Sequence, residues 1–420
     1  MRKIKADRTG GVNRKTLIAT VDIGKVTHTG YYRCPNGTDV RPFEFSNNAR
    51  GFKKFWEGIV QTLSASDLKD VVIGFESTGP YAEPLIHYLR RKPVRLVQVN
   101  PMHTKKLKEL QGNSPNKTDQ KDPKVIADII ELGHALTLVI PEGPAAELRR
   151  LTQARERSVQ GRAALFNTLQ HLVFVLFPEF LQVMKDVKTR SARYLLSRCP
   201  TPEDLLKCDF ESLACSVWNI SRGKVSRQRL QALYAAARES VGIQQGQEAM
   251  AFEIKNILRM IEASECFTSD VEEKMSSLLK QIPYSRSILS IKGIGEVTAA
   301  GLIGEVGDFR QFKTLSEITK LAGLDLFEIS SGRHQGQRRI SKRGRSLLRK
   351  LLFYAALNMV SRAGMMRQTY ESYLQRGMLK MKALTAIARK LLRIIFALVR
   401  DQSEYKEGYT QTKNALNEAA

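Results

Sequence analysis

The stretch TLIATVD, Thr16–Asp22, is a run of apolar and β-branched residues that ends in an acid. The same pattern returns in VVIGFE, Val71–Glu76, which also ends in a carboxylate. Short runs of this composition predict buried strands. We therefore predict that both stretches lie in the interior of a sheet and that Asp22 and Glu76 stand at the ends of their strands.

The residues around these two runs alternate between strand and helix patterns. A polar and basic segment, Lys105–Asp122, carries the turn residues Gly112, Asn113, Pro115 and Asn116 and predicts a loop. Three hairpin-like strands followed by helix–strand alternation predict an α/β domain, a mixed sheet flanked by helices. Its further strands are predicted at Val26–Arg33, Val40–Ser46 and Arg95–Asn100, and its helices at Asn48–Leu63, Tyr81–Arg91 and Pro123–Leu132.

Two further acids, Asp119 and Asp122, lie three residues apart just before the helix predicted after Pro123. Together with Asp22 and Glu76 they would form a cluster of four carboxylates. Carboxylates that converge repel one another unless a cation lies between them, and oxygen ligands of this kind hold Mg²⁺ or Mn²⁺. The sequence therefore predicts a site for Mg²⁺, with Mn²⁺ as the other candidate, and the substrate that suits it is a phosphodiester.

The charge of the chain favours nucleic acid as the partner. The 420 residues include 67 Lys and Arg against 42 Asp and Glu, a net charge of +25, and 42% are hydrophobic. This composition predicts a globular protein that binds a polyanion. We find no secretory signal and no apolar run long enough to cross a bilayer, so we expect a cytoplasmic protein without a membrane partner. The five cysteines form no CxxC pair and are interpreted as reduced, mostly buried thiols.

Composition and periodicity divide the chain into five segments. Residues 144–282 lose the strand pattern and carry two long helical stripes of apolar residues, with a less regular helical stretch between them. Such stripes favour an antiparallel coiled coil that pairs subunits, and an intramolecular bundle fits the pattern equally well. The segments are a basic tail (1–15), the sheet domain (16–143), the helical region (144–282), a further helical domain (283–400) and a polar tail (401–420).

The last domain carries two signals for contact with a nucleic-acid backbone. The stretch around Lys292, Gly293 and Gly295 has the pattern of a helix-hairpin-helix turn, although a plain helical turn also needs glycine. Between Arg333 and Lys350 the chain has eight Arg or Lys and no acid. Such a run is often only a solvated face. The candidate contacts in this tract are Arg333, Arg338, Arg339, Lys342, Arg343 and Arg345.

A Ser-Ser-Gly sequence, residues 330–332, directly precedes the basic tract. A serine beside guanidinium groups can act as a nucleophile toward phosphorus. Most Ser-Gly pairs are turns, so chemistry alone leaves both interpretations open.

Taken together, these motifs resemble the DEDD insertion-sequence transposases, a family of bridge-RNA-guided (or seek-RNA-guided) recombinases. The resemblance rests on Asp22 in VDIGK, Glu76 in FESTG, and the KTDQKD motif before Asp128. In the second half it rests on the GIG turn at Gly293, the AGL and SSG motifs, and the ISKRG motif followed by Leu348-Arg349. The chain departs from the family pattern after Gly323-Leu324, where Asp325 follows and relatives often have a proline.

The resemblance implies an RNase H-like N-terminal domain, a coiled-coil dimerisation segment and a helical transposase domain with a helix-hairpin-helix and a catalytic serine. It implies that Asp22, Glu76, Asp119 and Asp122 bind Mg²⁺ and that Ser331, rather than Ser330, is the nucleophile. DNA, a guide RNA and further copies of the chain, as a dimer or tetramer, are the implied partners. The alternatives are a Holliday-junction-type endonuclease that uses the same metal and water, and a non-enzymatic architectural protein.

Overall fold

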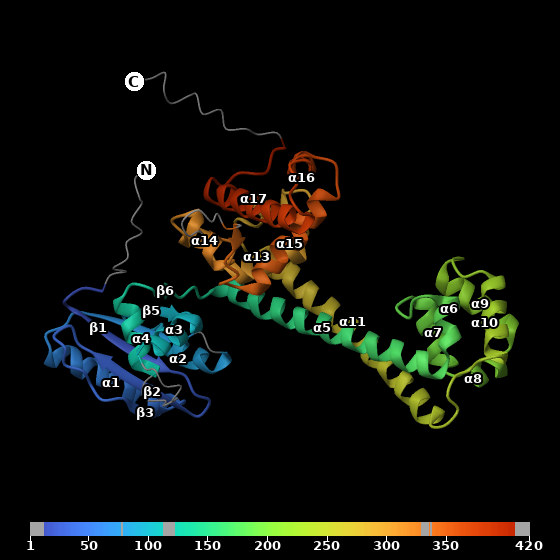
Figure 1. The fold of residues 1–420 in the computed structure, drawn as a ribbon, viewed down its shortest axis with the longest axis horizontal. Coiled ribbons are helices and arrows are strands. Elements are labelled where there is room, and N and C mark those ends of the chain that lie inside the picture. Colours follow the sequence, from blue (N-terminus) through green and yellow to red (C-terminus); the bar gives the residue numbers. More distant parts are fainter. Residues whose placement is uncertain (1–11, 77–78, 112–121, 329–335, 337, 408–420) are drawn as a thin grey trace, which may run out of the picture. The chain divides into compact units, whose positions relative to one another are not determined.

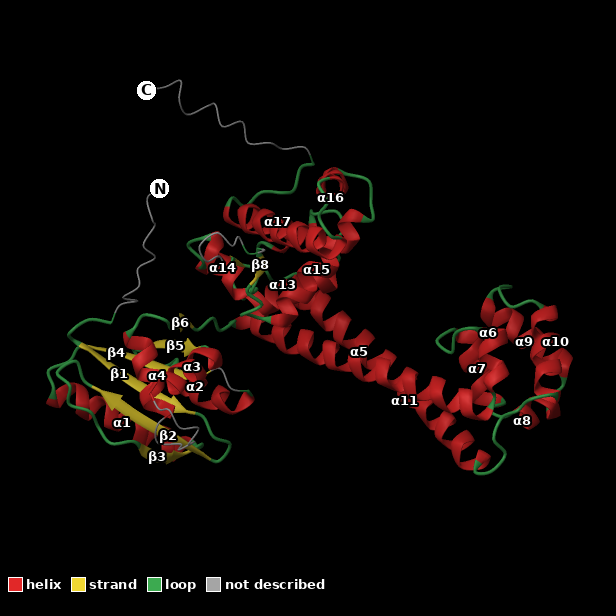
Figure 2. Ribbon diagram, in the orientation of Figure 1, coloured by secondary structure: helices red, strands yellow, loops and turns green. Residues whose placement is uncertain are grey.

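The computed structural model describes residues 12–76, 79–111, 122–328, 336 and 338–407. The chain forms two compact units, residues 1–139 and 140–420. The first unit is a mixed sheet with helices, and the second is almost entirely helical (Figure 1, Figure 2). This is the α/β plus all-α class that the sequence predicts.

The first unit is built on a six-stranded sheet in the order β3-β2-β1-β4-β5-β6, counted over the residues that the structure describes. Strands β1, β2 and β3 are antiparallel neighbours, whereas β1, β4 and β5 are parallel. This order and mixture of directions are those of an RNase H-like fold. The elements are β1 (Thr16–Asp22), β2 (Thr27–Arg33), β3 (Phe43–Ser46), α1 (Ala49–Ala65), β4 (Asp70–Glu76), η1 (Pro80–Ala82), α2 (Glu83–Leu89), β5 (Arg95–Val99), α3 (Pro101–Gln111), α4 (Asp122–Glu131) and β6 (Leu136–Thr137).

Helices α1 and α4 cover opposite faces of this sheet. The phenol of Tyr32 on β2 donates a hydrogen bond to the Phe55 carbonyl of α1 at 2.6 Å. Its neighbour Tyr31 belongs instead to the buried cluster that includes Ile126 and Ile130 of α4. Successive side chains of a strand point to opposite faces, so the two tyrosines mark the two sides of the sheet.

The loop predicted from Lys105 is wrong in its first half, because α3 runs from Pro101 to Gln111. Asn100 starts this helix. Its side chain accepts a hydrogen bond from the Met102 N–H at 2.9 Å, and its carbonyl accepts one from the His103 N–H at 2.8 Å. Asparagine followed by proline at the first helical position is a helix-start signal. The polar composition of the segment hid this signal.

Two long helices, α5 (Gly143–Leu176) and α11 (Gln247–Leu279), lie side by side in the second unit (Figure 1). They are antiparallel, since Arg155 pairs with Glu272 at 2.6 Å while Ser158 lies 2.9 Å from Ser264. Their far ends enclose a separate core with five short helices, whose central residues include Phe177 and Leu233. These helices are α6 (Pro178–Met184), α7 (Arg190–Arg198), α8 (Pro202–Lys207), α9 (Phe210–Ser221) and α10 (Arg227–Arg238). We call Phe177–Gly246 the tip module.

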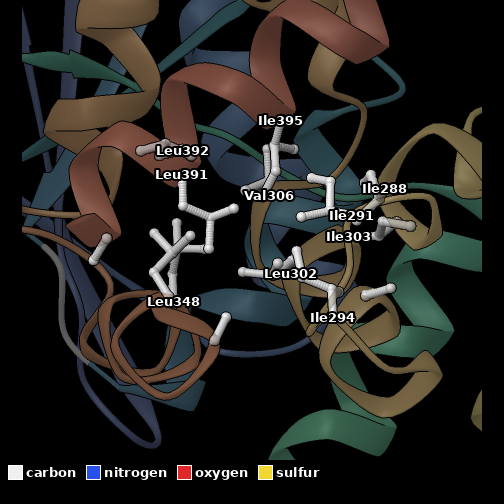
Figure 3. Close-up of a cluster of buried hydrophobic side chains, with 14 of the residues drawn as sticks. Ile288, Ile291, Ile294, Leu302, Ile303, Val306, Leu348, Leu391, Leu392 and Ile395 are labelled. Atoms are coloured by element: carbon white, nitrogen blue, oxygen red, sulfur yellow. The ribbon is translucent and has the colours of Figure 1, made fainter. Parts of the chain in front are cut away.

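The other ends of α5 and α11 join the core of the C-terminal helices. Its centre includes Ile288, Ile303 and Leu391, each fully buried (Figure 3). The remaining elements are α12 (Ser285–Leu289), α13 (Glu296–Val306), η2 (Phe309–Gln311), α14 (Leu315–Leu321), β7 (Leu326–Phe327), β8 (Arg339–Ile340), α15 (Ser346–Val360), α16 (Met365–Gln375) and α17 (Lys380–Arg400).

No disulfide joins the five cysteines, all of which lie in the described residues, but the prediction that most of them are buried is wrong. Cys34 and Cys199 are buried and Cys208 is half-buried, whereas Cys215 and Cys266 are exposed on α9 and α11. Helices α9 and α11 each carry an outward face, and a thiol on that face has no core to enter.

Over the described ranges, no single helix has both the length and the apolar composition that a membrane crossing needs. The bent pair of α5 and α6 meets that test by length and composition alone.

Candidate catalytic carboxylates and nucleic-acid interface

Asp22 and Glu76 end neighbouring parallel strands. The register pairs Thr20 with Gly74 and Val21 with Phe75, so the next position on each strand places Asp22 beside Glu76. Neighbouring strands lie about 4.8 Å apart, and side chains at matched positions of parallel strands point to the same face. Both carboxylates are half-buried. The predicted pair of strand-end acids therefore lies at one edge of the sheet and on one face.

That face is the one covered by α4. The Thr20 hydroxyl donates a hydrogen bond to the Pro123 carbonyl at 2.7 Å, and Thr20 shares its face of β1 with Asp22, two residues on. On β4, a Cβ built on Gly74 would lie 2.2 Å from Ile130 Cδ1 of α4. Glu76 shares that face with Gly74. The two strand-end carboxylates and the start of α4 thus lie on the same side of the sheet.

Asp122 is the first residue of α4 and directly precedes the proline that Thr20 holds. Its carboxylate lies 2.5 Å from the ammonium of Lys108 on α3, and its side chain is 19% exposed. The protein thus supplies one positive charge to this acidic corner. Lys108 was missed by sequence reasoning because it lies in the segment that was predicted to be a loop.

Asp128, which the family motif includes, serves a different purpose. Its carboxylate lies 2.5 Å from the Arg33 guanidinium of β2, which also lies 3.2 Å from Glu131. These ion pairs tie the second half of α4 to the sheet. Asp122 and Asp128 therefore sit on the same helix, one at the acidic corner and one in an ion pair that fixes the helix.

Asp119 lies outside the described residues, so the predicted set of four acids is represented by three. In the described ranges, no three acidic, thiol or imidazole groups are gathered closely enough to hold a metal ion. The donor type nevertheless suits Mg²⁺, because Asp22, Glu76 and Asp122 supply carboxylate oxygens from positions on the same side of the sheet.

Ser330 and Ser331 also lie outside the described residues, but the chain on either side of them is firmly held. β7 and β8 pair Phe327 with Arg339. Beyond that pair, the Ser341 N–H donates to the Asp325 carbonyl at 2.9 Å, and the Ser341 hydroxyl donates to the Asp325 carboxylate. Asp325, at the position where relatives often have proline, thus closes the base of the hairpin that carries the Ser-Ser-Gly motif.

The predicted helix-hairpin-helix turn lies between α12 and α13. Ile291 and Ile294 are buried in the core on either side of Lys292, which is exposed (Figure 3). Gly293 has a φ of +107°, a conformation that favours glycine, and Gly295 is the exposed residue before α13. The two isoleucines anchor the turn, and Lys292 and Gly295 are exposed where a phosphate could reach them.

The basic tract divides into exposed and structural residues. Arg339, Lys342 and Arg343 are exposed, and Arg338 pairs with Glu328 at 2.9 Å while remaining 75% exposed. Arg333 lies outside the described residues. Two of the exposed side chains, Arg338 and Arg339, lie at the start of β8, and Lys342 and Arg343 lie between β8 and α15.

Arg345 is enclosed by the fold. Its guanidinium donates a hydrogen bond to the Glu305 backbone carbonyl, and its backbone N–H donates to the Leu321 carbonyl at 2.7 Å. Burial, followed by repulsion from Arg149, lowers the pKa of Arg345 to about 10, so the group stays charged at neutral pH. Arg349 likewise donates to the Ala322 carbonyl at 3.0 Å. These two arginines tie the start of α15 to the end of α14, the two segments that flank β7 and β8.

Comparison with known proteins agrees with this arrangement. Residues 19–178 match the model of the DEDD transposases of IS110 type, described as a transposase, and residues 285–371 match the transposase family of IS116, IS110 and IS902. The 43.6 kDa protein of insertion element IS110 from Streptomyces coelicolor is 24% identical, over 92% of this chain and 94% of its own length. The 44.8 kDa protein of IS116 from Streptomyces clavuligerus is 25% identical, over 71% of this chain and 75% of its own length.

The sheet unit with its strand-end acids and the helical unit with its basic turns are those of a DNA-recombining enzyme. The chain belongs to the DEDD insertion-sequence transposases of the IS110 family. A transposase of Coxiella burnetii, from insertion sequence IS1111A, is 31% identical over 33% of this chain and 39% of its own length.

Proposed function

We propose that the chain is an RNA-guided transposase that exchanges DNA strands through Mg²⁺-binding carboxylates and a serine nucleophile. The observation that supports it most strongly is the register of β1 and β4, which sets Asp22 beside Glu76 on the face where α4 begins with Asp122. Two charged carboxylates at matched positions of neighbouring strands repel each other, and a cation bound between them would offset that repulsion. A transposase acts on a phosphodiester, and a cation bound there could polarise the scissile phosphate.

Asp22, Glu76, Asp119 and Asp122 would hold Mg²⁺, with Mn²⁺ as an acceptable substitute. When bound, the ion withdraws charge from the scissile phosphate and orients it. Without the ion, the Lys108 ammonium lies 2.5 Å from the Asp122 carboxylate and offsets its charge, which limits repulsion among the three described acids. α4 stays in place through Arg33 and Thr20, which keeps Asp122 on the side of the sheet that Asp22 and Glu76 face.

Ser331 would attack phosphorus. The new bond joins Ser331 Oγ to phosphorus, the bond to one DNA oxygen breaks, and the serine proton passes to the departing oxygen. A hydroxyl of the incoming strand then attacks the same phosphorus and releases the serine. The number of phosphoester bonds is unchanged, so the strand can be rejoined without ATP. Lys342 and Arg343, exposed beyond β8, would contact the DNA backbone near this serine.

The long helices support self-association. Phe252, Met260 and Phe267 of α11 are 74%, 48% and 48% exposed and fall on one face of the helix, since they are spaced by eight and seven residues. A second copy of the chain would cover this stripe. The dimer or tetramer would then bring carboxylates and serine from different copies to one DNA strand.

The guide RNA rests on the family resemblance. Sequence choice by a guide RNA agrees with the exposed basic residues of the tract and with Lys292, which lie outside the helices and suit contact with a nucleic-acid backbone.

The decisive experiment traps the covalent intermediate. Purified protein is incubated with its co-purifying RNA, radiolabelled donor DNA and Mg²⁺, and the products are separated by denaturing electrophoresis. We expect a labelled protein–DNA species that is lost in Ser331→Ala and kept in Ser330→Ala. A Ser331→Ala protein that cuts DNA normally and releases free ends would instead establish the water-dependent endonuclease.

A further inference from the structure

The tip module has a cavity that the proposed chemistry does not use. It measures about 260 Å³ and lies between α9 and the start of α10. Val217 and Leu230, each 1% exposed, form its apolar floor, and Trp218 forms one wall. Sites for drug-sized ligands occupy roughly 300–1,000 Å³. This smaller cavity suits a single ring system.

Trp218 is held so that its indole faces the cavity. α9 ends in Arg222, with a left-handed φ of +51°, and the Gly223 N–H donates to the Trp218 carbonyl at 3.0 Å. A Cβ built on Gly223 would lie 3.2 Å from the indole, so the loop packs directly on the ring. The side chain is nevertheless 53% exposed. The loop thus packs against one part of the indole, and about half of the Trp218 side chain remains accessible.

The loop that supports this tryptophan is strongly basic. Residues 222–229, RGKVSRQR, contain four Arg or Lys and no acid. Arg222, Lys224 and Arg227 are exposed. Arg227 is fixed at the mouth of the cavity by an ion pair with Glu211, and its guanidinium lies 5.5 Å from the centre of the Phe210 ring. The Glu211 charge is thus taken up by Arg227, and Arg222 and Lys224 have no ion-pair partner among the described residues.

We propose that this cavity, the Trp218 pocket, binds one unpaired nucleotide of a single-stranded nucleic acid. The base stacks on the open indole above the apolar floor, and the flanking phosphates contact Arg222, Lys224 and Arg227. An aromatic platform beside a basic backbone track is the combination that binds single strands. A duplex does not fit, because its bases are stacked and paired. An apolar protein side chain could fill the cavity but would give no reason for the basic loop.

A cysteine in the pocket can report whether the pocket is occupied. Cys215 lines the cavity and is exposed, and Cys266 on α11 is also exposed but is not among the residues that line the cavity. An occupant of the pocket must therefore slow the alkylation of Cys215 and leave Cys266 as an internal control. This local readout is needed because a chain of net charge +25 binds nucleic acid at other places too.

The experiment labels the full chain with N-ethylmaleimide in EDTA and quantifies the two cysteine peptides by mass spectrometry. EDTA chelates Mg²⁺ and so prevents the proposed strand exchange. The proposal for the Trp218 pocket and the proposed function can therefore fail or succeed separately. The probes are oligouridylate RNA, oligothymidylate DNA of equal length, and a duplex. We expect either or both single strands to protect Cys215 but not Cys266, and their comparison tells RNA from DNA. Equal labelling of Cys215 with and without both strands overturns the proposal, as does equal protection by the duplex.

Variants sharpen the test. Trp218→Ala should weaken the protection, shifting the half-protecting oligonucleotide concentration upward by about fivefold to a hundredfold, whereas Trp218→Phe keeps a stacking ring and should restore most of it. Lys224→Glu should weaken protection more than Arg238→Glu, a matched change at the exposed far end of α10. Lys224 is a surface residue, so its variant keeps the test valid if Trp218→Ala fails to fold. Full protection in both Trp218→Ala and Lys224→Glu contradicts the site.

Discussion

The two units position their charged residues by different means, strand register in the first and burial in the second. In the sheet unit, Asp22 and Glu76 come from strands about fifty residues apart, and the parallel register alone sets them side by side. In the C-terminal part of the helical unit, the charged residues come from one short tract, and burial sorts them. Lys342 is exposed, while Arg345 three residues on donates to the Glu305 carbonyl inside the fold.

The role of a strand-end acid follows from local geometry. A strand has two faces and a defined end, so the side chain of an acid at the end of a buried strand can take few positions. A basic residue on a turn can take many, and its role depends on which carbonyls lie within reach. Substitution of a strand-end acid is therefore expected to affect catalysis. The effect of substituting a basic residue on a turn should depend on whether that residue is buried or exposed.

The largest effect is expected from the acid pair. Asp22→Asn and Glu76→Gln should each reduce DNA strand cleavage by about 100-fold or more, because loss of a supporting residue around a metal already costs about 10–100-fold and these are proposed ligands. Binding of DNA should persist. The assay is cleavage of labelled donor DNA against Mg²⁺ concentration.

The matched control is Asp128→Asn, which removes an acid of the same motif that pairs with Arg33. It should retain cleavage and lose only some stability. If Asp128→Asn is as inactive as Asp22→Asn, the division of roles between the two acids on this face is wrong.

The next effect concerns Arg345. Replacing it with methionine should lower the free energy of unfolding of the helical unit by about 1.5–3 kcal/mol, because a charged hydrogen-bond donor inside the fold is lost. Thermal or urea unfolding followed by circular dichroism measures it. A variant with unchanged stability would place the Arg345 guanidinium outside the fold and restore it as a candidate DNA contact.

A third prediction tests the packing that places Asp122. Gly74→Ala should destabilise the sheet unit by about 1–3 kcal/mol, because its Cβ would overlap Ile130 Cδ1 and push α4 from the sheet. Gly161→Ala on α5, where a Cβ meets nothing within 4 Å, should instead stabilise the chain by about 0.5–1 kcal/mol. Urea unfolding of both variants is the measurement, and similar effects of the two substitutions would rule out tight packing of α4 on β4.

The smallest effect is expected from Lys342, an exposed residue of the basic tract between Arg333 and Lys350. Lys342→Gln should weaken DNA binding uniformly across sequences and reduce the salt slope of the binding constant by about 1, with stability changed by less than about 0.5 kcal/mol. Fluorescence anisotropy at several salt concentrations tests this. A slope equal to that of the unmodified chain would exclude Lys342 from the backbone contacts.

Much of the sheet unit could be predicted from sequence. The apolar runs that end at Asp22 and Glu76 are confirmed as β1 and β4, because a buried strand needs a continuous run of apolar residues and leaves a local signature. Helix α3 could not be predicted from its polar composition, and with it Lys108 was missed, although Asn100 and Pro101 marked its start. The roles of Asp119 and Ser331 stay predictions.

In the helical unit, periodicity predicts helices but not which helices pack together. Nothing local distinguishes Arg345 from Lys342, since both lie in the same basic run. Trp218 is likewise a single aromatic residue in a helical stretch that periodicity did not resolve. Its open ring and the cavity beside it depend on how α9, α10 and the loop between them pack.

Local sequence patterns are enough to predict which residue types lie at the ends of buried strands and on basic turns, because strand and turn signals extend over a few residues. Tertiary packing is what places α4 on the same face as Asp22 and Glu76, brings Lys108 to Asp122 and encloses Arg345. Those outcomes depend on contacts between residues far apart in the chain, and no short-range pattern records which groups will meet.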